Sequence, residues 1–462
     1  MKSFGSIWRF LAAAVLPVAA AGADARQDST VSAGVRRVVA PVRLVIPSSL
    51  DRRPVRLVEW TPAGARVAPA TVPEEFAIDA ANEVIPAAEV IAIFAPDDTL
   101  DDAVPWGPGA TSGLIDRSRS RSPARVRVTL ADGQRYVGSV RPAEASEPSD
   151  ARSLADAPFT LQTSLFGDLV ISLEHVAMIE PISQAAGQGG LPAGPEPPRR
   201  PGTDRVVLVN GDRIEGFIES VGIEVAIAPD ASSGRAIDLA RVPIDRVRAI
   251  EFANAAVPLA GFVAWVNDHS GEMHVVRAAQ VRITASGEAT ILPDIPGFAA
   301  LAWVVGSHQV AAFTPDASRV VPLCSIAAPE FEPDRSRRWG RPPRVDAGLR
   351  SPLGLGDVVL QGAMDARWAL PSGVTALAGT VELSPESRLW GDCKVSVSIE
   401  RAGGLPHVVW AGTLQSDSPA AVIGASIPDP GDRGVLRVRI EPGLHGHVHN
   451  HVTLRGFMLI RE

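Results

Sequence analysis

Residues 126–140 have the sequence VRVTLADGQRYVGSV, and residues 205–218 have the sequence RVVLVNGDRIEGFI. Both alternate apolar and polar residues around an Asp-Gly or Asn-Gly pair, and a second glycine follows five residues after the first. Such pairs are a strong signal of a two-residue hairpin, because both turn positions then take a positive φ. The second glycines, Gly138 and Gly216, would suit a bulge or sharp bend in a strand that curls into a small barrel. The two stretches therefore predict one antiparallel β unit twice.

A second pattern closes each predicted unit: an apolar segment, a short polar interruption and a final strand. Two further units are expected, one opening at 55–60 and one at 262–265. We expect four copies of a four- or five-stranded meander, and two β domains with similar hairpins are the alternative. The opening of the unit resembles that of Sm-like small barrels in shape. The closing segments are 85–93, 171–179, 242–250 and, in the weakest copy, 321–326.

The composition limits the class of protein. A length of 462 residues suggests two to four domains, and 46% hydrophobic residues suffice to bury a core. With 41 glycines and 40 prolines, the chain is rich in turns, which favours short strands over long helices. A net charge of −8 argues against a nucleic-acid binder. Two cysteines, Cys324 and Cys393, exclude a disulfide-rich scaffold and a cysteine-rich zinc site, and they leave a single bridge as an open question.

The N-terminus has the pattern of a secretory signal peptide over residues 1–23. Lys2 and Arg9 lie at the start of an apolar run over 11–20, and a small-residue site ends at Ala23. The run is too short for a transmembrane helix, and no other segment reaches 18 uninterrupted apolar residues. We therefore expect an exported protein without a transmembrane segment, located in the periplasm, at the cell surface or outside the cell.

Stretches rich in Gly, Pro, Ser and charge divide the rest of the chain. They predict β units at 32–96, 125–182, 204–254 and 258–333, linkers at 97–124, 183–203 and 334–350, and a C-terminal domain at 351–462.

The C-terminal domain has a different pattern. Alternating strands over 363–383, 393–400, 408–414, 434–441 and 452–460 are separated by Gly and Pro turns, and no helical period appears. This succession predicts an antiparallel, jelly-roll-like β-sandwich. The expected fold class is thus mainly β, with repeated small meander or barrel-like units followed by a sandwich.

The order of these strands resembles the NPCBM family (novel putative carbohydrate-binding module), which is also attached to glycoside hydrolase family 98 enzymes. The resemblance implies a sandwich that binds carbohydrate. Of the family's terminal Asp-His-Ala-Asp-Trp signature only His451 is present, with Asn450 and Thr453 at the acidic positions. Sugar binding would therefore need other polar groups. The matching segments are 367–373, 377–383, 394–400, 409–414, 435–440 and 450–460.

A carbohydrate site needs an aromatic ring to stack on the sugar, flanked by planar hydrogen-bonding groups. Trp368 and Trp410 lie in alternating strands, which favours the core for both. Trp390 precedes Gly391-Asp392 in a turn context, so it is the expected stacking residue. The candidate carbohydrate-binding residues are Trp390, Asp392, Asn450 and His451.

Four histidines alternate near the C-terminus: His445, His447, His449 and His451. In an extended strand they would share one face, which makes them weak candidates for a metal site. A polar loop is the alternative, because alternate residues lie about 7 Å apart and all four could not reach one ion without bending. We expect no metal and no cofactor.

No catalytic motif appears among the residues: there is no Gly-x-Ser-x-Gly, His-Glu-x-x-His or P-loop pattern. The sequence therefore favours an exported, non-catalytic β protein whose C-terminal module binds a polysaccharide or another glycan. The alternative is an envelope or matrix assembly protein, in which the sandwich contacts other envelope proteins. An enzyme of unknown type is a third possibility.

Overall fold

The structure is a computed structural model. It describes residues 42–461 except 51, 74–76, 78, 82, 96–124, 142–157, 183–201, 230–239, 297–300, 335–339, 347, 349–350, 402–404, 428–433, 445 and 447–448. The predicted signal peptide and most of the predicted linkers 97–124 and 183–203 lie outside the described residues. The regular elements of the described part are strands and short 3-10 turns, which confirms the mainly β fold class. Among the described residues, no helix has the length and apolarity needed to cross a membrane.

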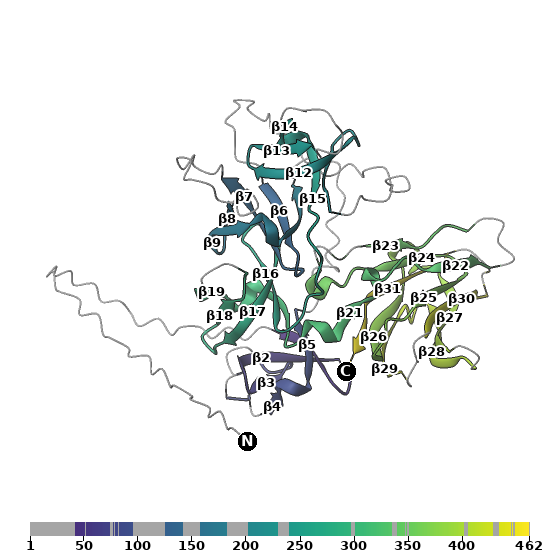
Figure 1. The fold of residues 1–462 in the computed structure, drawn as a ribbon. Coiled ribbons are helices and arrows are strands. Elements are labelled where there is room, and N and C mark those ends of the chain that lie inside the picture. The colour runs from purple at the N-terminus through teal and green to yellow at the C-terminus, as the bar shows by residue number, and fades with distance from the viewer. Residues whose placement is uncertain are drawn as a thin grey trace, which may run out of the picture. The chain divides into compact units, whose positions relative to one another are not determined.

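Four meanders of five strands each precede the sandwich (Figure 1). In every meander the strands pair antiparallel in the order fifth, first, second, third, fourth. Pairing of the fifth strand with the first is what curls each sheet into a barrel-like unit. The strands are β1 Val42–Pro47, β2 Arg53–Thr61, β3 Gly64–Pro69, β4 Glu83–Pro86 and β5 Val90–Phe94 (unit 1); β6 Arg125–Leu130, β7 Arg135–Arg141, β8 Pro158–Thr163, β9 Gly167–Ser172 and β10 Val176–Pro181 (unit 2); β11 Asp204–Leu208, β12 Arg213–Val221, β13 Glu224–Pro229, β14 Ala240–Pro243 and β15 Val247–Glu251 (unit 3); and β16 Val263–Asn267, β17 Met273–Ile283, β18 Glu288–Pro293, β19 Trp303–Gly306 and β20 Val310–Thr314 (unit 4).

The closing pattern of each unit is a strand, one 3-10 turn and a strand. The turns are η2 Ala87–Glu89, η5 Leu173–His175, η7 Ile244–Arg246 and η8 Ser307–Gln309. The fourth closing segment differs from the expectation. Unit 4 closes with β19, η8 and β20, whereas Val320–Pro322 (β21) pairs with the last strand of the chain.

The hairpin turns predicted at Asp132-Gly133 and Asn210-Gly211 form, but with another geometry. Only the glycines have positive φ, 84° for Gly133 and 91° for Gly211. Gly133 N–H donates to the Leu130 carbonyl and Leu130 N–H donates to the Gln134 carbonyl, the pattern of a three-residue loop with a left-handed third residue. The predicted two-residue turn is therefore wrong, because only the glycine of each pair takes a positive φ. The Asp132 side chain caps its turn by accepting from Gln134 N–H at 3.2 Å.

The second glycines lie where two strands approach closely. A Cβ at Gly138 would lie 2.4 Å from the Gln162 carbonyl oxygen, and a Cβ at Gly216 would lie 2.4 Å from the Ala228 carbonyl oxygen. Real Cβ atoms do not approach an oxygen so closely, so a side chain at either position would push the strands apart. The same packing requirement thus recurs in units 2 and 3.

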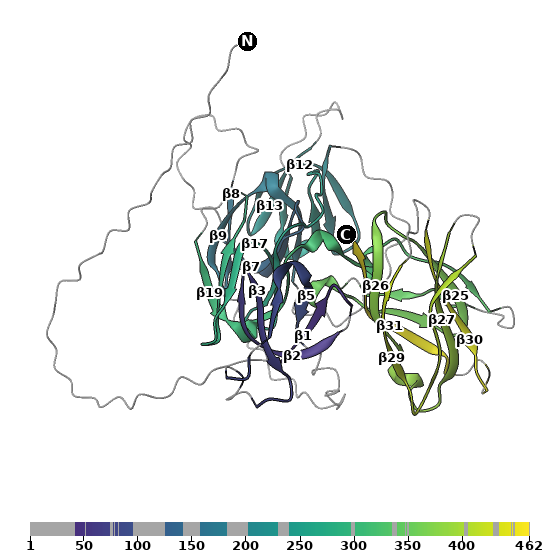
Figure 2. The same ribbon diagram turned by 90° about the horizontal axis from the view of Figure 1, so that it is seen from below.

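The C-terminal strands form two packed sheets (Figures 1 and 2). Figure 2 shows β26, β29 and β31 in one layer and β25, β27 and β30 in the other. The first sheet holds β23 Arg344–Val345, β24 Val358–Gln361, β31 His451–Arg461, β26 Val374–Leu383 and β29 Ala420–Ser426, with β21 paired to β31; the second holds β22 Glu330–Pro333, β25 Met364–Ala369, β30 Val435–Pro442, β27 Asp392–Glu400 and β28 His407–Gln415. Because β21 and β22 precede residue 334, strand pairing draws part of the range predicted for unit 4 into the sandwich.

The sandwich and the units share a buried apolar cluster. Ala376, Ala378, Met458 and Ile460 of the first sheet lie in one cluster with residues of units 1 and 4. A hydrogen bond accompanies the cluster, since the Arg52 guanidinium donates to the Gly456 carbonyl at 3.3 Å. The members from the units include Ile46, Leu50, Ile91, Val263, Trp265, Met273 and Val275.

Candidate functional site

Two segments meet at one end of the sandwich. They contain Trp390, Asp392 and Asn450, and the fourth predicted carbohydrate-binding residue, His451, begins β31 directly after the second segment. One runs from Ser384 through the 3-10 turn Pro385–Ser387 (η12) to Asp392, and the other lies between β30 and β31, where Gly443, Leu444, Gly446, His449 and Asn450 are described. We call this end the loop site. Ser384 N–H donates to the His451 carbonyl at 2.9 Å, and Gly443 N–H donates to the Asp392 carbonyl at 3.0 Å.

The turn that carries Trp390 is tightly closed. Gly391 N–H donates to the Ser387 carbonyl at 2.6 Å, and Trp390 N–H donates to the same oxygen at 3.2 Å. A Cβ at Gly391 would lie 2.6 Å from that oxygen and 2.8 Å from the His449 carbonyl oxygen. Glycine is therefore needed where the two segments touch, and Trp390 lies next to this contact.

Trp390 is exposed to 69%, as the turn context predicted. Two leucines near it in the loop site are also exposed, Leu389 to 76% and Leu444 to 95%. The sequence analysis did not single out either leucine. By contrast, Trp368 is buried in the sandwich core and Trp410 is partly buried against it, which confirms the expectation for these two.

Asp392 and Asn450 are buried, and their polar atoms hold the loop site together. Asp392 Oδ2 accepts from Leu444 N–H at 2.7 Å. Asn450 Nδ2 donates to the Gly446 carbonyl at 2.6 Å, while Asn450 Oδ1 is buried without a hydrogen-bond partner. Both hydrogen bonds end on the backbone between β30 and β31, so these two side chains position that segment. That Asp392 or Asn450 binds a sugar directly remains a prediction.

His451 and Glu386 form a half-exposed polar pair beside the turn. Their side chains approach to 3.1 Å between Nδ1 and Oε1. Partial burial raises the pKa of the Glu386 carboxyl, but hydrogen bonds from its own backbone N–H and from His451 outweigh burial, so its pKa lies below the ordinary value. Glu386 is thus an ionised, planar acceptor at neutral pH. The sequence carried no signal for Glu386, because only the fold brings it to His451.

The histidine tract does not form one extended strand. His449 has a φ of 57°, and β31 begins only at His451, so the backbone turns between the two. Among the described residues, no three His, Cys, Asp or Glu side chains lie together as metal ligands would. His445 and His447 lie outside the described residues. The metal-site candidate therefore remains untested.

The two cysteines are separate and buried. Neither Cys324 nor Cys393 is in a disulfide, although both belong to the sandwich core. Cys324 Sγ lies 3.2 Å from both Gly354 O and Gly356 N. Burial raises the pKa of Cys393 to about 12, so its thiol is protonated and poorly nucleophilic.

No protein-family model matches the chain, and no curated protein matches it. Similar solved structures include carbohydrate-binding modules. The CBM51 module of Clostridium perfringens GH95, solved with methyl-galactose, is 12% identical over 30% of this chain and 99% of that one, with a TM-score of 0.23. The CBM51-2 and INT domains of Clostridium perfringens ZmpB, solved with GlcNAc, are 8% identical over 43% of each chain, with a TM-score of 0.25. Tandem CBM51 modules of the Streptococcus pneumoniae family 98 glycoside hydrolase are 9% identical over 56% of this chain and 71% of that one, with a TM-score of 0.24.

Proposed function

We propose that this is an exported, non-catalytic β protein whose sandwich binds a glycan at the loop site. The exposed indole of Trp390 carries the proposal. A flat ring at 69% exposure, on a turn whose backbone is held by hydrogen bonds, offers a stacking surface for the C–H face of a sugar. Because the backbone hydrogen bonds of Ser387, Gly391 and Asp392 hold the turn, little conformational entropy would be lost on binding.

The groups around the ring suit a neutral sugar. His451 and Glu386 offer planar donor and acceptor atoms at one edge of the loop site, where sugar hydroxyls could bind. The charge of Arg388, two residues before Trp390, is paired with Glu382 at 3.4 Å. The buried Asp392 and Asn450 act as positioning residues in this proposal.

Binding of the full-length chain to a panel of polysaccharides, by pull-down followed by calorimetry, tests the proposal. We expect saturable binding to at least one glycan. Trp390→Ala should weaken it about tenfold or more, because an aromatic contact contributes on the order of 1 kcal/mol beyond the apolar area it buries. Trp390→Phe should retain most of the affinity. Leu405→Ala, at an exposed position on another loop, is the matched control.

An assembly function is the second candidate, and the exposed leucines favour it. Leu389 and Leu444, which belong to the loop site with Trp390, would also suit a protein partner, because exposed apolar patches often mark contact sites. The apolar surface shared between the units and the sandwich gives this candidate no support, since it is buried within the chain. If the folded full-length chain binds no glycan in the panel, the carbohydrate proposal fails and the assembly function replaces it.

A further inference from the structure

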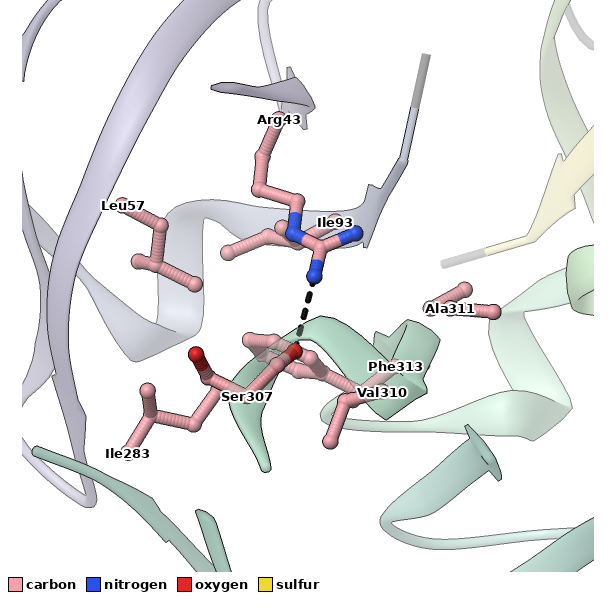
Figure 3. A pocket seen from close by; sticks show the side chains of 9 residues that line it. Arg43, Leu57, Ile93, Ile283, Ser307, Val310, Ala311 and Phe313 are labelled. Atoms are coloured by element: carbon pink, nitrogen blue, oxygen red, sulfur yellow. Dashed lines mark hydrogen bonds between the residues drawn. The ribbon is translucent and has the colours of Figure 1, made fainter. Parts of the chain in front are cut away.

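Arg43 of β1 is a buried charge that lacks a counter-charge in the described structure. The residue is 5% exposed, and its guanidinium points into a small cavity between unit 1 and unit 4 (Figure 3). One of its terminal nitrogens donates to the Ser307 carbonyl oxygen at 2.9 Å, which is the one hydrogen bond that Arg43 makes to described residues. A guanidinium has five N–H groups, so most of its hydrogen-bonding capacity is unused.

The charge of Arg43 persists at neutral pH. Burial lowers its pKa to about 10, which still leaves it protonated. No carboxylate of the described chain lies within ion-pair distance of it. Arg205, which is buried to a similar degree, has Glu215 and Glu251 at 3.6 and 3.7 Å. Burying an unpaired charge costs free energy of folding, so a negative partner is expected for Arg43. The described chain does not supply one.

The cavity has the size and lining for a small anion. Its volume is about 10 Å³, which is room for about one water molecule or a monatomic ion of similar size. Besides Arg43, Ser307 lines the cavity, and its hydroxyl is buried without a hydrogen-bond partner among the described residues. The Ser307 carbonyl is already occupied by Arg43. The remaining walls are apolar, formed by Leu57, Ile93, Ile283, Val310, Ala311, Ala312 and Phe313.

We propose that Arg43 and Ser307 bind a single chloride ion at the junction of units 1 and 4. The guanidinium supplies the positive charge, the hydroxyl supplies a second donor, and the apolar walls exclude bulk water and larger anions. A water molecule would fit the space but would leave the charge unpaired. Ile93 and Phe313, two of the wall residues, are also paired between β5 and β20, where the two units join. The bound ion would therefore stabilise the contact between the units.

Thermal unfolding of the full-length chain at constant ionic strength, with chloride exchanged for gluconate, tests the proposal. We expect the midpoint to rise by about 1.5 °C for each tenfold increase in chloride above its dissociation constant. Bromide should replace chloride, whereas gluconate, which is too large, should not. A midpoint that depends on ionic strength but not on the identity of the anion would overturn the proposal.

Variants separate this site from general salt effects. Arg43→Met should abolish the chloride dependence, and Ser307→Ala should reduce it. Arg205→Met, which removes an arginine with carboxylate partners, should leave the dependence intact even if it lowers the midpoint. If both Arg43→Met and Ser307→Ala keep the chloride dependence of the parent, the ion binds elsewhere and the assignment is wrong.

Crystals of the unaltered chain grown in bromide provide a measurement that does not depend on variant folding. We expect an anomalous scattering peak in the cavity beside the Arg43 guanidinium. An ordered water there, with no anomalous signal, would show that the charge is left unpaired and would refute the proposal.

Discussion

His274 lies at the centre of the polar contact between units 2 and 4. Its side chain is fully buried, and its Nδ1 accepts from Val137 N–H at 3.3 Å, which places the proton of the neutral ring on Nε2. Nε2 lies 3.9 Å from Asp268 Oδ2, and Arg125 lies 3.7 Å from the same oxygen. Burial lowers the pKa of His274 to about 4; Asp268 raises it and Arg125 lowers it further, so the folded chain holds the neutral form.

This burial predicts a loss of stability in acid. Because the unfolded His274 binds a proton near pH 6.5 and the folded one near pH 4, stability should fall as the pH drops between these values, by about 3 kcal/mol in total. Denaturant unfolding of the chain at a series of pH values measures this slope. His274→Gln should remove most of it, whereas His175→Gln, at a half-exposed histidine, should not. An unchanged slope in His274→Gln would assign the acid sensitivity to other groups.

At the loop site, the local sequence predicted the environment of one residue but not of its neighbours. The Arg-Leu-Trp-Gly-Asp context of Trp390 correctly predicted an exposed ring, because a turn leaves its side chains without a sheet to pack on. It could not show that Asp392 and Asn450 are buried. Their environment depends on long-range contacts with Leu444 and Gly446, and no local pattern encodes those contacts.

Elements were predicted well where their structure is local. The hairpins of units 2 and 3 follow from their Asp-Gly and Asn-Gly pairs. The segment 321–326 also forms the strand and 3-10 turn that its pattern indicated, as β21 and Leu323–Ser325 (η10). What failed was its partner: β21 pairs with β31 of the sandwich, because β19 and β20 already complete unit 4. Partner choice depends on long-range packing, which a local pattern does not contain.

In units 2 and 3 the strands approach closely at the second glycine, Gly138 or Gly216. Gly216→Ala should destabilise the chain by about 2 kcal/mol, because its Cβ would meet both the Ala228 carbonyl and the Ile227 side chain, and relieving such overpacking costs about 1–3 kcal/mol. Phe217→Ala, at the exposed neighbouring position, should cost less than about 1 kcal/mol. Equilibrium unfolding in urea compares the two. Equal stabilities would mean that strands β12 and β13 separate without cost and that the glycine has no packing role.

At the scale of the whole molecule, the units and the sandwich stabilise one another. The sandwich takes two strands from the chain before residue 334, and the apolar face around Met458 and Ile460 is covered by residues of units 1 and 4. A boundary drawn from composition alone, at 334–350, follows a charged and Pro-rich stretch of sequence. It does not follow the strand pairing, because β22 reaches across it to pair with β25. The loop site is therefore best studied in the full chain.

Truncation tests this interdependence. A fragment over 335–462 lacks β21 and β22, so β31 and β25 each lose a neighbouring strand, and Met458 and Ile460 lose their cover. Each such side chain, when fully uncovered, forfeits roughly 1.5–3 kcal/mol of burial. We expect this fragment to unfold at a lower temperature than the sandwich in the full chain and to bind a hydrophobic dye. A fragment over 320–462 restores both strands but not the units, so its midpoint should lie between the two. If the 335–462 fragment unfolds at the same temperature as the full chain, the shared apolar cluster contributes nothing to the sandwich, and the units serve only as a spacer.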